Sequence, residues 1–350
     1  MKPPLATRFL GEGEYPIWDA LVAGAAEGSP YHSSEYLRAL CEATGGSFRI
    51  LVTARAPEIL GGVALYQEEG RGGVEIAPRL LLYYNGIVLR PSESKYPSQR
   101  TARQLEVLGA LEPALRQLGC ARLRLKCRSP FRDARVFQAS GWTVQPSYSY
   151  VVPLSDLGRL RERVEQNLRR LIDRCARQGI TLTEDDDFLS FFRMHLETHE
   201  RKGAAVYLPR PGFERYFHRL RAAGLMRLYH ARLPDGRSIS AQLVLGGPHP
   251  VAHTVSAAAD ARYLNLGATA FLRWKVFEDL KARGHEGNDL TDAALNPVTH
   301  FKSQLGGDLE IGLTLEAPAP WPVIARRFGA QFAARLRGGL RRALSRRRAD

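Results

Sequence analysis

The rest of this chain is arranged around one segment, Arg262-Tyr-Leu-Asn-Leu-Gly-Ala-Thr-Ala-Phe-Leu-Arg-Trp-Lys-Val-Phe-Glu-Asp-Leu-Lys-Ala-Arg-Gly284. A polar turn that contains Gly267 leads into a helix, which we expect over residues 266–283. Gly284 stands where a C-terminal helix cap belongs, because glycine adopts the left-handed backbone of that position without strain. A turn followed by a helix points free backbone N–H groups at an anionic or carbonyl-bearing ligand. The segment therefore predicts a ligand site as well as a helix.

Two further elements follow this helix and carry charged side chains. A short strand is expected over residues 287–290 and carries Asp289, and a helix that begins after Pro297 presents Lys302. Strand ends and the loops after them are where α/β folds gather functional residues. These elements therefore place a carboxylate and a cation close to the turn and helix described above.

The composition predicts two domains and a basic tail. With 350 residues, of which 44% are hydrophobic, the chain is long enough to form more than one core. We expect domains over residues 1–153 and 154–316, followed by a tail over 317–350. The formal net charge is +14, and residues 321–350 supply +8 of it through nine Arg and one Asp. Such a segment binds nucleic acid or an anionic membrane surface, or is a solvated arm with no partner.

The apolar residues of the tail suggest which partner it has. They recur at every fourth position from Ile324 to Leu344, with arginines between them. An apolar stripe flanked by Arg is the pattern of a helix that lies on an anionic membrane, and we expect residues 321–348 to do so. Gly338 and Gly339 weaken this helix, so a disordered arm or an RNA-binding arm remains an alternative.

The sequence argues against export and against a metal site. It has no apolar N-terminal segment of signal-peptide type and no run of about 18 apolar residues, so we expect a cytoplasmic protein. Its four cysteines form no C-x-x-C pair, which argues against a zinc site and a disulfide framework. His195 and His199 stand at i and i+4, but the order H-L-E-T-H is not the H-E-x-x-H of zinc proteases. No metal is expected.

The same order of elements occurs twice along the chain. Apolar and alternating runs separated by turn residues predict strands, and apolar residues at helical spacing predict helices. In the first half a short helix over 34–44 is followed by strands over 48–56, 60–67 and 80–89, a helix over 98–118 and a strand over 121–127. In the second half helices over 157–178, 188–200 and 212–223 precede strands over 225–233, 238–245 and 251–257, then the helix over 266–283 and the strand over 287–290.

This repeated plan resembles a tandem pair of GNAT-like acyltransferase folds, and the second half looks like the Fem-type aminoacyltransferases. The resemblance implies an α/β (α+β) protein of two GNAT-like domains, each with a mixed, mostly antiparallel sheet flanked by helices. The motifs that carry it are the segment 167–180, Arg201-Lys202-Gly203, Asp289-Leu290, and Phe301-Lys302 followed by Gly306-Gly307.

The resemblance implies roles for individual residues. Acyl transfer to an amine needs a positive or hydrogen-bonding group where the carbonyl oxygen gains charge, and Lys302 aligns with the Lys that serves near the acyl donor. Asp289 and Asp292 are the carboxylates that can orient the amine or accept its proton, although Asp292 also suits a turn cap. The expected substrate-binding residues are Phe301, Tyr83, Tyr84, Asn85 and Arg201, and the run 80–86 is otherwise a core strand.

A cofactor loop is the last feature that the resemblance implies. Arg262, Asn265, Gly267 and Ala268 resemble the GNAT loop that holds the pyrophosphate of coenzyme A with backbone N–H groups, with Asn265 in place of its first Gly. A simple helix entry explains the same residues. The donor is therefore either an acyl-CoA or an aminoacyl-tRNA, which would spread its charge over basic helices.

The sequence thus predicts an acyltransferase that acylates an amino group of a cell-envelope precursor, either peptidoglycan or polysaccharide. No tightly bound cofactor is expected. A possible partner is tRNA, and residues 321–348 would hold the protein peripherally at the inner face of the cell membrane. The alternative is a non-catalytic binding or scaffold protein that keeps the tandem fold, which the altered glycine loop allows.

Overall fold

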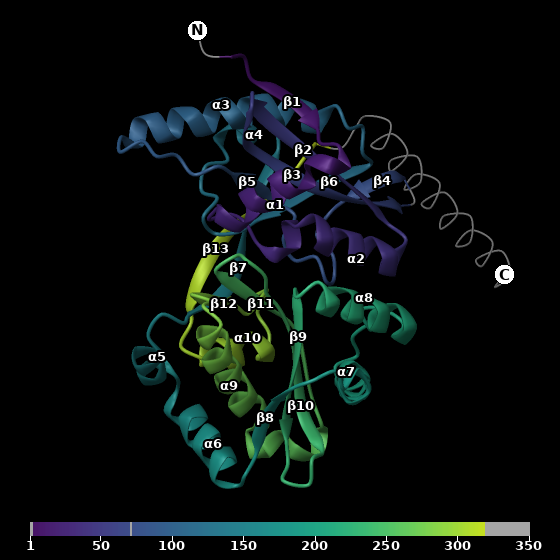
Figure 1. Cartoon of the computed structure of the whole chain (residues 1–350), viewed down its shortest axis with the longest axis vertical. Helices are drawn as coiled ribbons and strands as arrows, with labels where there is room; N and C mark the ends of the chain where they lie inside the picture. Colours follow the sequence, from purple (N-terminus) through teal and green to yellow (C-terminus); the bar gives the residue numbers. More distant parts are fainter. Residues whose placement is uncertain (1–2, 71, 319–350) are drawn as a thin grey trace, which may run out of the picture.

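We describe the chain from a computed structural model that covers residues 3–70 and 72–318 (Figure 1). The expected membrane-binding segment 321–348 lies outside these residues. The described part has an upper and a lower half, each with strands flanked by helices, and this confirms the predicted fold class. No helix within these residues combines the length and the apolar character needed to cross a membrane.

The first half contains seven strands and four α-helices among the described residues. The helices pack on the strands through their apolar faces, as in other layered α/β folds. The strands are β1 (Ala6–Phe9), β2 (Ser47–Arg55), β3 (Glu58–Gly70), β4 (Gly73–Ile76), β5 (Ile87–Leu89), β6 (Arg122–Cys127) and β7 (Thr143–Pro153). The helices are α1 (Tyr15–Gly24), α2 (Ser34–Thr44), α3 (Pro97–Arg116) and α4 (Arg135–Ala139).

The second half adds six strands and six α-helices among the described residues. The strands are β8 (Thr181–Glu184), β9 (Met226–Arg232), β10 (Ser238–Leu245), β11 (Val251–Ala259), β12 (Gly287–Asp289) and β13 (Asp308–Glu316). The helices are α5 (Leu157–Arg163), α6 (Gln166–Arg177), α7 (Phe188–Arg201), α8 (Arg210–Ala222), α9 (Ala268–Ala282) and α10 (Pro297–Ser303), and a 3-10 helix, η3 (Ala261–Leu266), leads into α9.

One continuous sheet joins the two halves. Its order is β1-β2-β3-β4-β6-β13-β7-β12-β11-β10-β9-β8, with β5 paired to β3 outside this path. The last strand of the second half, β13, lies between β6 and β7 and is antiparallel to both. Strand β7 in turn pairs with β12, which runs parallel to β11. The junction between the halves is therefore a stretch of sheet, and both of its faces can carry site residues.

Three groups of buried side chains form the core. One lies in the first half between α3 and the strands, and one lies in the second half between α5, α6, α9 and the sheet. The third spans both halves, because α1 and α2 of the first half share it with α7 and α8 of the second. Tyr36 and Tyr216, which it contains, join α2 to α8 by a hydrogen bond of 2.9 Å between their hydroxyls. The halves thus share a core as well as a sheet.

Two of the segments predicted from the sequence have a different structure. The helix expected over 157–178 is two helices, because Val164 and Glu165 are extended and the Glu165 amide donates to the Gln304 carbonyl at 3.0 Å. The strand expected over 80–89 is formed only at β5, and residues 80–86 are an irregular loop. This loop runs into the junction, where its side chains bond to the second half. Tertiary contacts therefore override local propensity at both segments.

The insertion of β13 makes a prediction about Gly312. A Cβ atom at Gly312 would lie 2.4 Å from the Cys127 carbonyl oxygen of β6, so Gly312→Ala must move one strand. We expect a loss of about 1–3 kcal/mol in the free energy of unfolding, the usual cost of overpacking. Urea denaturation measures it.

The matched control is Gly109→Ala in the interior of α3, where a Cβ meets no atom within 4 Å. That change is expected to stabilise the protein by about 0.5–1 kcal/mol. Equal stability of Gly312→Ala and the unchanged protein would show that β13 is not tightly seated on β6.

Candidate functional site

Lys302 projects from α10 toward the end of β12. The helix begins at a cap formed by Asn296, whose side chain accepts from the Thr299 amide at 3.0 Å. The Lys302 Nζ donates to the carbonyl oxygen of Thr291 and, at 2.7 Å, to that of Asp292. An ammonium group has three N–H donors, so these bonds leave one for a ligand.

The loop that Lys302 holds has an unusual backbone. Thr291 and Asp292 have φ angles of 47° and 54°, in the left-handed region that residues other than glycine rarely adopt. Such backbone persists only where the surroundings enforce it, and it clusters at functional sites. The two bonds from Lys302 supply part of that enforcement, so one side chain both shapes the loop and presents a charge beside it.

The surroundings of Lys302 weaken its hold on a proton. Burial, and after it the positive charge of Arg273 on α9, lowers its pKa to about 8, although Asp292 and Asp289 act in the opposite direction. Arg273 is itself buried, and its Nε and Nη1 have no hydrogen-bond partner within the described part of the chain. Desolvation lowers the pKa of Arg273 to about 10. Desolvated cations without a paired anion are costly, so this region favours an anionic or oxyanionic ligand.

Asp289 lies at the end of β12 but does not face solvent. Its side chain is 2% exposed and accepts hydrogen bonds from the Tyr84 hydroxyl at 2.9 Å, the Ser149 hydroxyl and the Thr291 amide at 2.8 Å. His253 Nδ1 lies 3.6 Å from the same carboxylate. These contacts join the 80–86 loop and β7 to the turn after β12. Asp289 is thus placed to position the Lys302 loop rather than to touch a substrate.

The other first-half residues lie on either side of Tyr84. The Tyr83 hydroxyl is 3.5 Å from that of Tyr207, in the segment that follows α7. Asn85 is buried. Its side chain bonds to the backbone of β6 as a neighbouring strand would, because it accepts from the Lys126 amide at 2.9 Å and donates to the Arg124 carbonyl at 3.0 Å. Tyr83 is therefore near the junction surface, whereas Asn85 fixes the edge of β6.

A cavity of about 370 Å³ lies beside the loop of Asp292. The outward face of β6 supplies a row of cations to it, and Tyr148 of β7 forms another part of its wall. Lys126, the innermost cation, lies 5.6 Å from the centre of the Tyr84 ring, and burial lowers its pKa. The row consists of Arg122, Arg124 and Lys126, of which the two arginines lie 3.4 and 3.9 Å from Glu316.

This row was not singled out from the sequence, although a signal exists. In Arg-Leu-Arg-Leu-Lys, residues 122–126, every second residue is basic, and alternate side chains of a strand point to one face. Arg273 carries a second overlooked signal, because it is a charge within the largely apolar run of α9. Both signals depend on knowing which face of the element meets the other half.

The predicted cofactor loop is packed against α6. Gly267 has φ 91°, and a Cβ there would lie 2.6 Å from the Leu171 Cβ. The Arg174 side chain donates to the carbonyls of Asn265 and Leu266 at 2.5 and 2.7 Å. Arg262 is paired with Asp260 at 2.6 Å and Ala268 is buried. Packing between helices thus accounts for the glycine and for the shape of this turn.

The remaining predicted residues have clear positions. Phe301 is half-buried and packs against the core of the second half, which anchors α10. Gly306 and Gly307 allow α5 and β7 to approach closely, since a Cβ at either would lie within about 3.0 Å of them. Arg201 is exposed at the last turn of α7. The Phe-Lys and Gly-Gly motifs therefore place Lys302, whereas Arg201 lies on the surface.

Two groups of metal-ligand residue types occur in the second half. The rings of His195 and His199 lie 4.1 Å apart at an angle of 47°, and His199 Nδ1 bonds to the Ala205 carbonyl at 2.8 Å. The side chains of Asp185, Asp187 and His230 converge, but the Arg232 guanidinium lies 2.9 and 3.0 Å from the two carboxylates. Arg232 thus supplies the positive charge at that point.

The Tyr84–Asp289 bond yields a prediction about stability. Tyr84→Phe leaves a buried carboxylate with one donor fewer, and we expect it to lower the free energy of unfolding by about 1–3 kcal/mol. Tyr148→Phe is the matched control, because Tyr148 is 40% exposed, and it is expected to be close to neutral. Urea denaturation of both variants is the measurement. A Tyr84→Phe protein as stable as the control would mean that the hydrogen bond from Tyr84 to Asp289 does not help to join the halves.

The sequence and the fold of this chain were compared with those of known proteins. Residues 161–303 match the acetyltransferase (GNAT) domain family. No curated protein sequence matches the chain significantly. Among solved structures, FemX is 12% identical with a TM-score of 0.70, and the match covers 89% of this chain and 96% of FemX.

Two further structures share the fold at lower similarity. L-PGS from Bacillus licheniformis is 14% identical with a TM-score of 0.52, over 84% of this chain and 95% of that one. A tandem GNAT protein from the clavulanic acid biosynthesis pathway is 13% identical with a TM-score of 0.53, over 91% of this chain and 99% of that one. The second half of the chain therefore matches an acetyltransferase (GNAT) domain, and the whole chain has the fold of FemX and of the tandem GNAT protein.

Proposed function

We propose that this GNAT-type acyltransferase transfers an aminoacyl or acyl group to an amino group of a cell-envelope precursor, and that transfer takes place beside Lys302. The observation that carries the proposal is the placement of this ammonium group. It is largely desolvated and is fixed by the carbonyls of Thr291 and Asp292, and Asp292 lines a cavity with a row of cations. A fixed donor in a water-poor site stabilises developing negative charge far better than one in water.

The chemistry assigns each group a task. The acceptor nitrogen attacks the carbonyl carbon of an ester or thioester, a C–N bond forms, and the carbonyl oxygen gains a negative charge that Lys302 stabilises. The C–O or C–S bond then breaks, and the proton released by the amine ends on the leaving group. Asp292 lines the cavity beside Lys302 and is the carboxylate placed to relay that proton.

The row of cations on β6 supports an anionic substrate. Activated cell-envelope precursors and both candidate donors carry phosphate groups. Three basic side chains, Arg122, Arg124 and Lys126, face the same cavity as Asp292, and Glu316 offsets only part of their charge. The proposal therefore places a phosphate of one substrate on β6 and the reacting carbonyl at Lys302.

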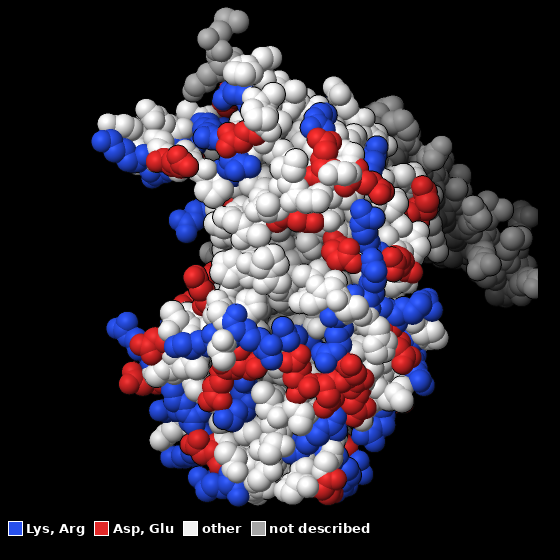
Figure 2. Space-filling model, in the orientation of Figure 1, with Lys and Arg blue, Asp and Glu red and all other residues white. Residues whose placement is uncertain are grey.

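We further propose aminoacyl-tRNA as the donor. The turn of Arg262 to Ala268 is occupied by contacts with α6, which leaves it a poor cradle for the pyrophosphate of coenzyme A. Helix α6 keeps Arg170 and Arg177 exposed, and on the face shown in Figure 2 basic and acidic side chains are interspersed over the second half. A tRNA would contact such basic side chains over a wide area.

The first test concerns activity and Lys302. The intact mass of soluble peptidoglycan precursors and amino sugars is measured after incubation with aminoacyl-tRNAs or with acyl-CoA. The unchanged protein is expected to add one acyl group, and Lys302→Ala is expected to do so about 100- to 1,000-fold more slowly. Lys95→Ala, an exposed lysine in the first half, is the control. Absence of any mass gain with all acceptors would favour a non-catalytic binding protein.

The pH dependence tests the charge of Lys302. Because its pKa is lowered to about 8, the ammonium form is lost as the pH rises above that value, well below the ordinary range of lysine. An arginine keeps its charge throughout. We divide the rate of the unchanged protein by the rate of Lys302→Arg, because the ionisation of the acceptor amine affects both rates equally. This ratio is expected to fall about tenfold per pH unit above pH 8. A ratio that rises there would make Lys302 a base instead.

The donor is tested by salt dependence. Binding of aminoacyl-tRNA is expected to weaken steeply with salt, and the double variant Arg170→Glu and Arg177→Glu should reduce the slope of log K against log salt by about 1.4–1.8. Arg100→Glu on α3 is the control. Tight, weakly salt-dependent binding of acetyl-CoA, with no binding of tRNA near physiological salt, would make the protein coenzyme A-dependent.

A further inference from the structure

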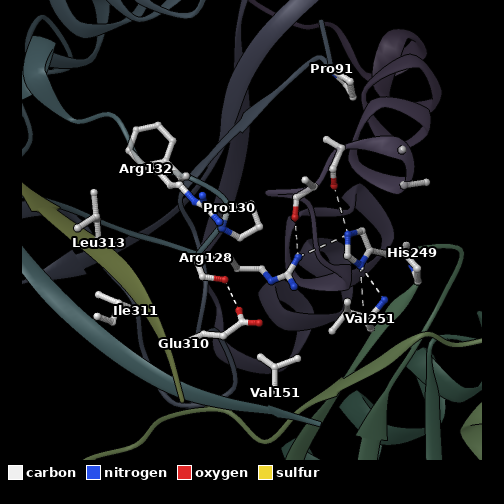
Figure 3. Close-up of a pocket in the computed structure, with 17 residues that line it drawn as sticks. Pro91, Arg128, Pro130, Arg132, Val151, His249, Val251, Glu310, Ile311 and Leu313 are labelled. Atoms are coloured by element: carbon white, nitrogen blue, oxygen red, sulfur yellow. Dashed lines mark hydrogen bonds between the residues drawn. The ribbon is translucent and has the colours of Figure 1, made fainter. Parts of the chain in front are cut away.

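A second and larger cavity lies between the halves, away from Lys302 (Figure 3). Its volume is about 930 Å³, within the range of sites for small molecules. The C-terminal end of α1, the loop after β6, and strands β7, β11 and β13 form its walls. A small void beside Tyr84 and Asp289 shares residues with this cavity and with the cavity at Asp292. The cluster around Asp289 therefore separates two distinct sites.

Arg128 is the buried cation of the larger cavity. It is 5% exposed, and its Nη1 donates to the carbonyls of Ala26 and Gly28 in the first half. Its Nε and Nη2 have no partner within the described residues, and no carboxylate there lies within 4.0 Å of it. Glu27 is near, and burial raises the pKa of its carboxyl, but it forms no ion pair with Arg128. A buried guanidinium in this state favours an anionic group on a ligand.

Glu310 of β13 supplies a negative charge to the same cavity. It is half-buried and accepts a hydrogen bond from the Ser129 hydroxyl. No Lys or Arg of the described residues lies within 4.0 Å of it. Figure 3 shows the Glu310 carboxylate and the Arg128 guanidinium facing one space with no bond between them. Because Arg128 and Glu310 do not pair with each other, each can pair with a group of the opposite charge on a ligand.

The rest of the wall limits the ligand further. Arg132 lies exposed among the lining residues and adds a second cation, while burial lowers the pKa of His249 to about 4, so that ring is neutral. Between the charges the wall is apolar, and Ile311 is 56% exposed there. The apolar lining residues include Pro130, Phe131, Val151, Val251 and Ile311. A ligand with an apolar middle part between two charged ends would cover these apolar residues.

We propose that this cavity binds a small zwitterion, an amino acid or short peptide with a free carboxylate, a free amine and apolar side chains. The carboxylate bonds to the unpartnered nitrogens of Arg128, with Arg132 beside it. The amine bonds to Glu310, and the side chains lie on the apolar wall. The site is separate from the proposed transfer at Lys302 and does not depend on it.

Calorimetric titration of the full chain tests the proposal. The probes are leucine, leucyl-leucine and trileucine, together with N-acetyl-leucyl-leucine and leucyl-leucine amide. At least one free zwitterion is expected to bind, and the loss of either charge of leucyl-leucine should weaken its binding about tenfold or more, as charge-assisted hydrogen bonds require. If none of the free zwitterions binds at millimolar concentration, the proposal is wrong.

A variant at Glu310 sharpens the test without disturbing Arg128, which also holds the end of α1. Glu310→Gln keeps the size of the side chain and the bond to Ser129 but removes the charge, so it should bind leucyl-leucine and its N-acetyl form about equally. Glu316→Gln, on the same strand but outside the cavity, should keep the preference of the unchanged protein. Lys302→Ala should also keep it. Retention of the full preference in Glu310→Gln would overturn the proposed contact with the amine.

Discussion

Strand β13 sits between β6 and β7, and the register of these strands sets where the cations of β6 lie relative to the loop after Asp289. Thr314 lies opposite Lys126 on one side and Gln145 on the other. Ser149 and Asp289 belong to neighbouring strands of the same junction and meet through a hydrogen bond. Because strand side chains alternate between faces, a shift of one residue would move Lys126 to the opposite face from the cavity at Asp292. The register therefore brings cations of the first half to a loop of the second.

The electrostatics of the junction follow from burial. Lys302 bonds only to carbonyls, Arg273 has buried nitrogens without partners, and Arg128 bonds to carbonyls and contacts His249. No carboxylate of the described chain forms an ion pair with any of the three. Asp289, the buried acid between them, is already saturated by Tyr84, Ser149 and the Thr291 amide. The described part of the protein thus holds cations without a direct ion pair on both sides of one hydrogen-bonded acid, which suits ligands with anionic groups.

Much of the fold follows from local sequence patterns, and the exceptions have physical causes. Helix α2 and strand β10 begin and end where periodicity predicts, and Gly284 has the φ of 89° that a cap needs. The 80–86 loop has the composition of a strand, but its backbone serves the junction and Leu81 has φ 71°. Strand β13 has alternating apolar residues from Leu309 to Leu315, a signal that we did not use. Its partners lie far away in sequence, so pairing could not be foreseen.

The candidate site is harder to predict than the fold, and the turn before α9 shows why. The sequence around Gly267 has the pattern of a loop that approaches a phosphate closely, and close approach does require this glycine. The group approached is the Leu171 side chain, while Arg174 takes the neighbouring carbonyls. A glycine pattern predicts that another group approaches the backbone closely, but it does not show whether that group is a ligand or a neighbouring helix.

Lys302 differs from Gly267 in this respect. Core packing does not explain why an ammonium group is desolvated near Arg273. It also does not explain why two of its N–H groups bond to the left-handed turn at Thr291 and Asp292. An apolar side chain would fill the same space without the cost of desolvating a charge. The strand end at Asp289, rather than the helix entry at Gly267, is therefore where the structure holds features that packing alone leaves unexplained.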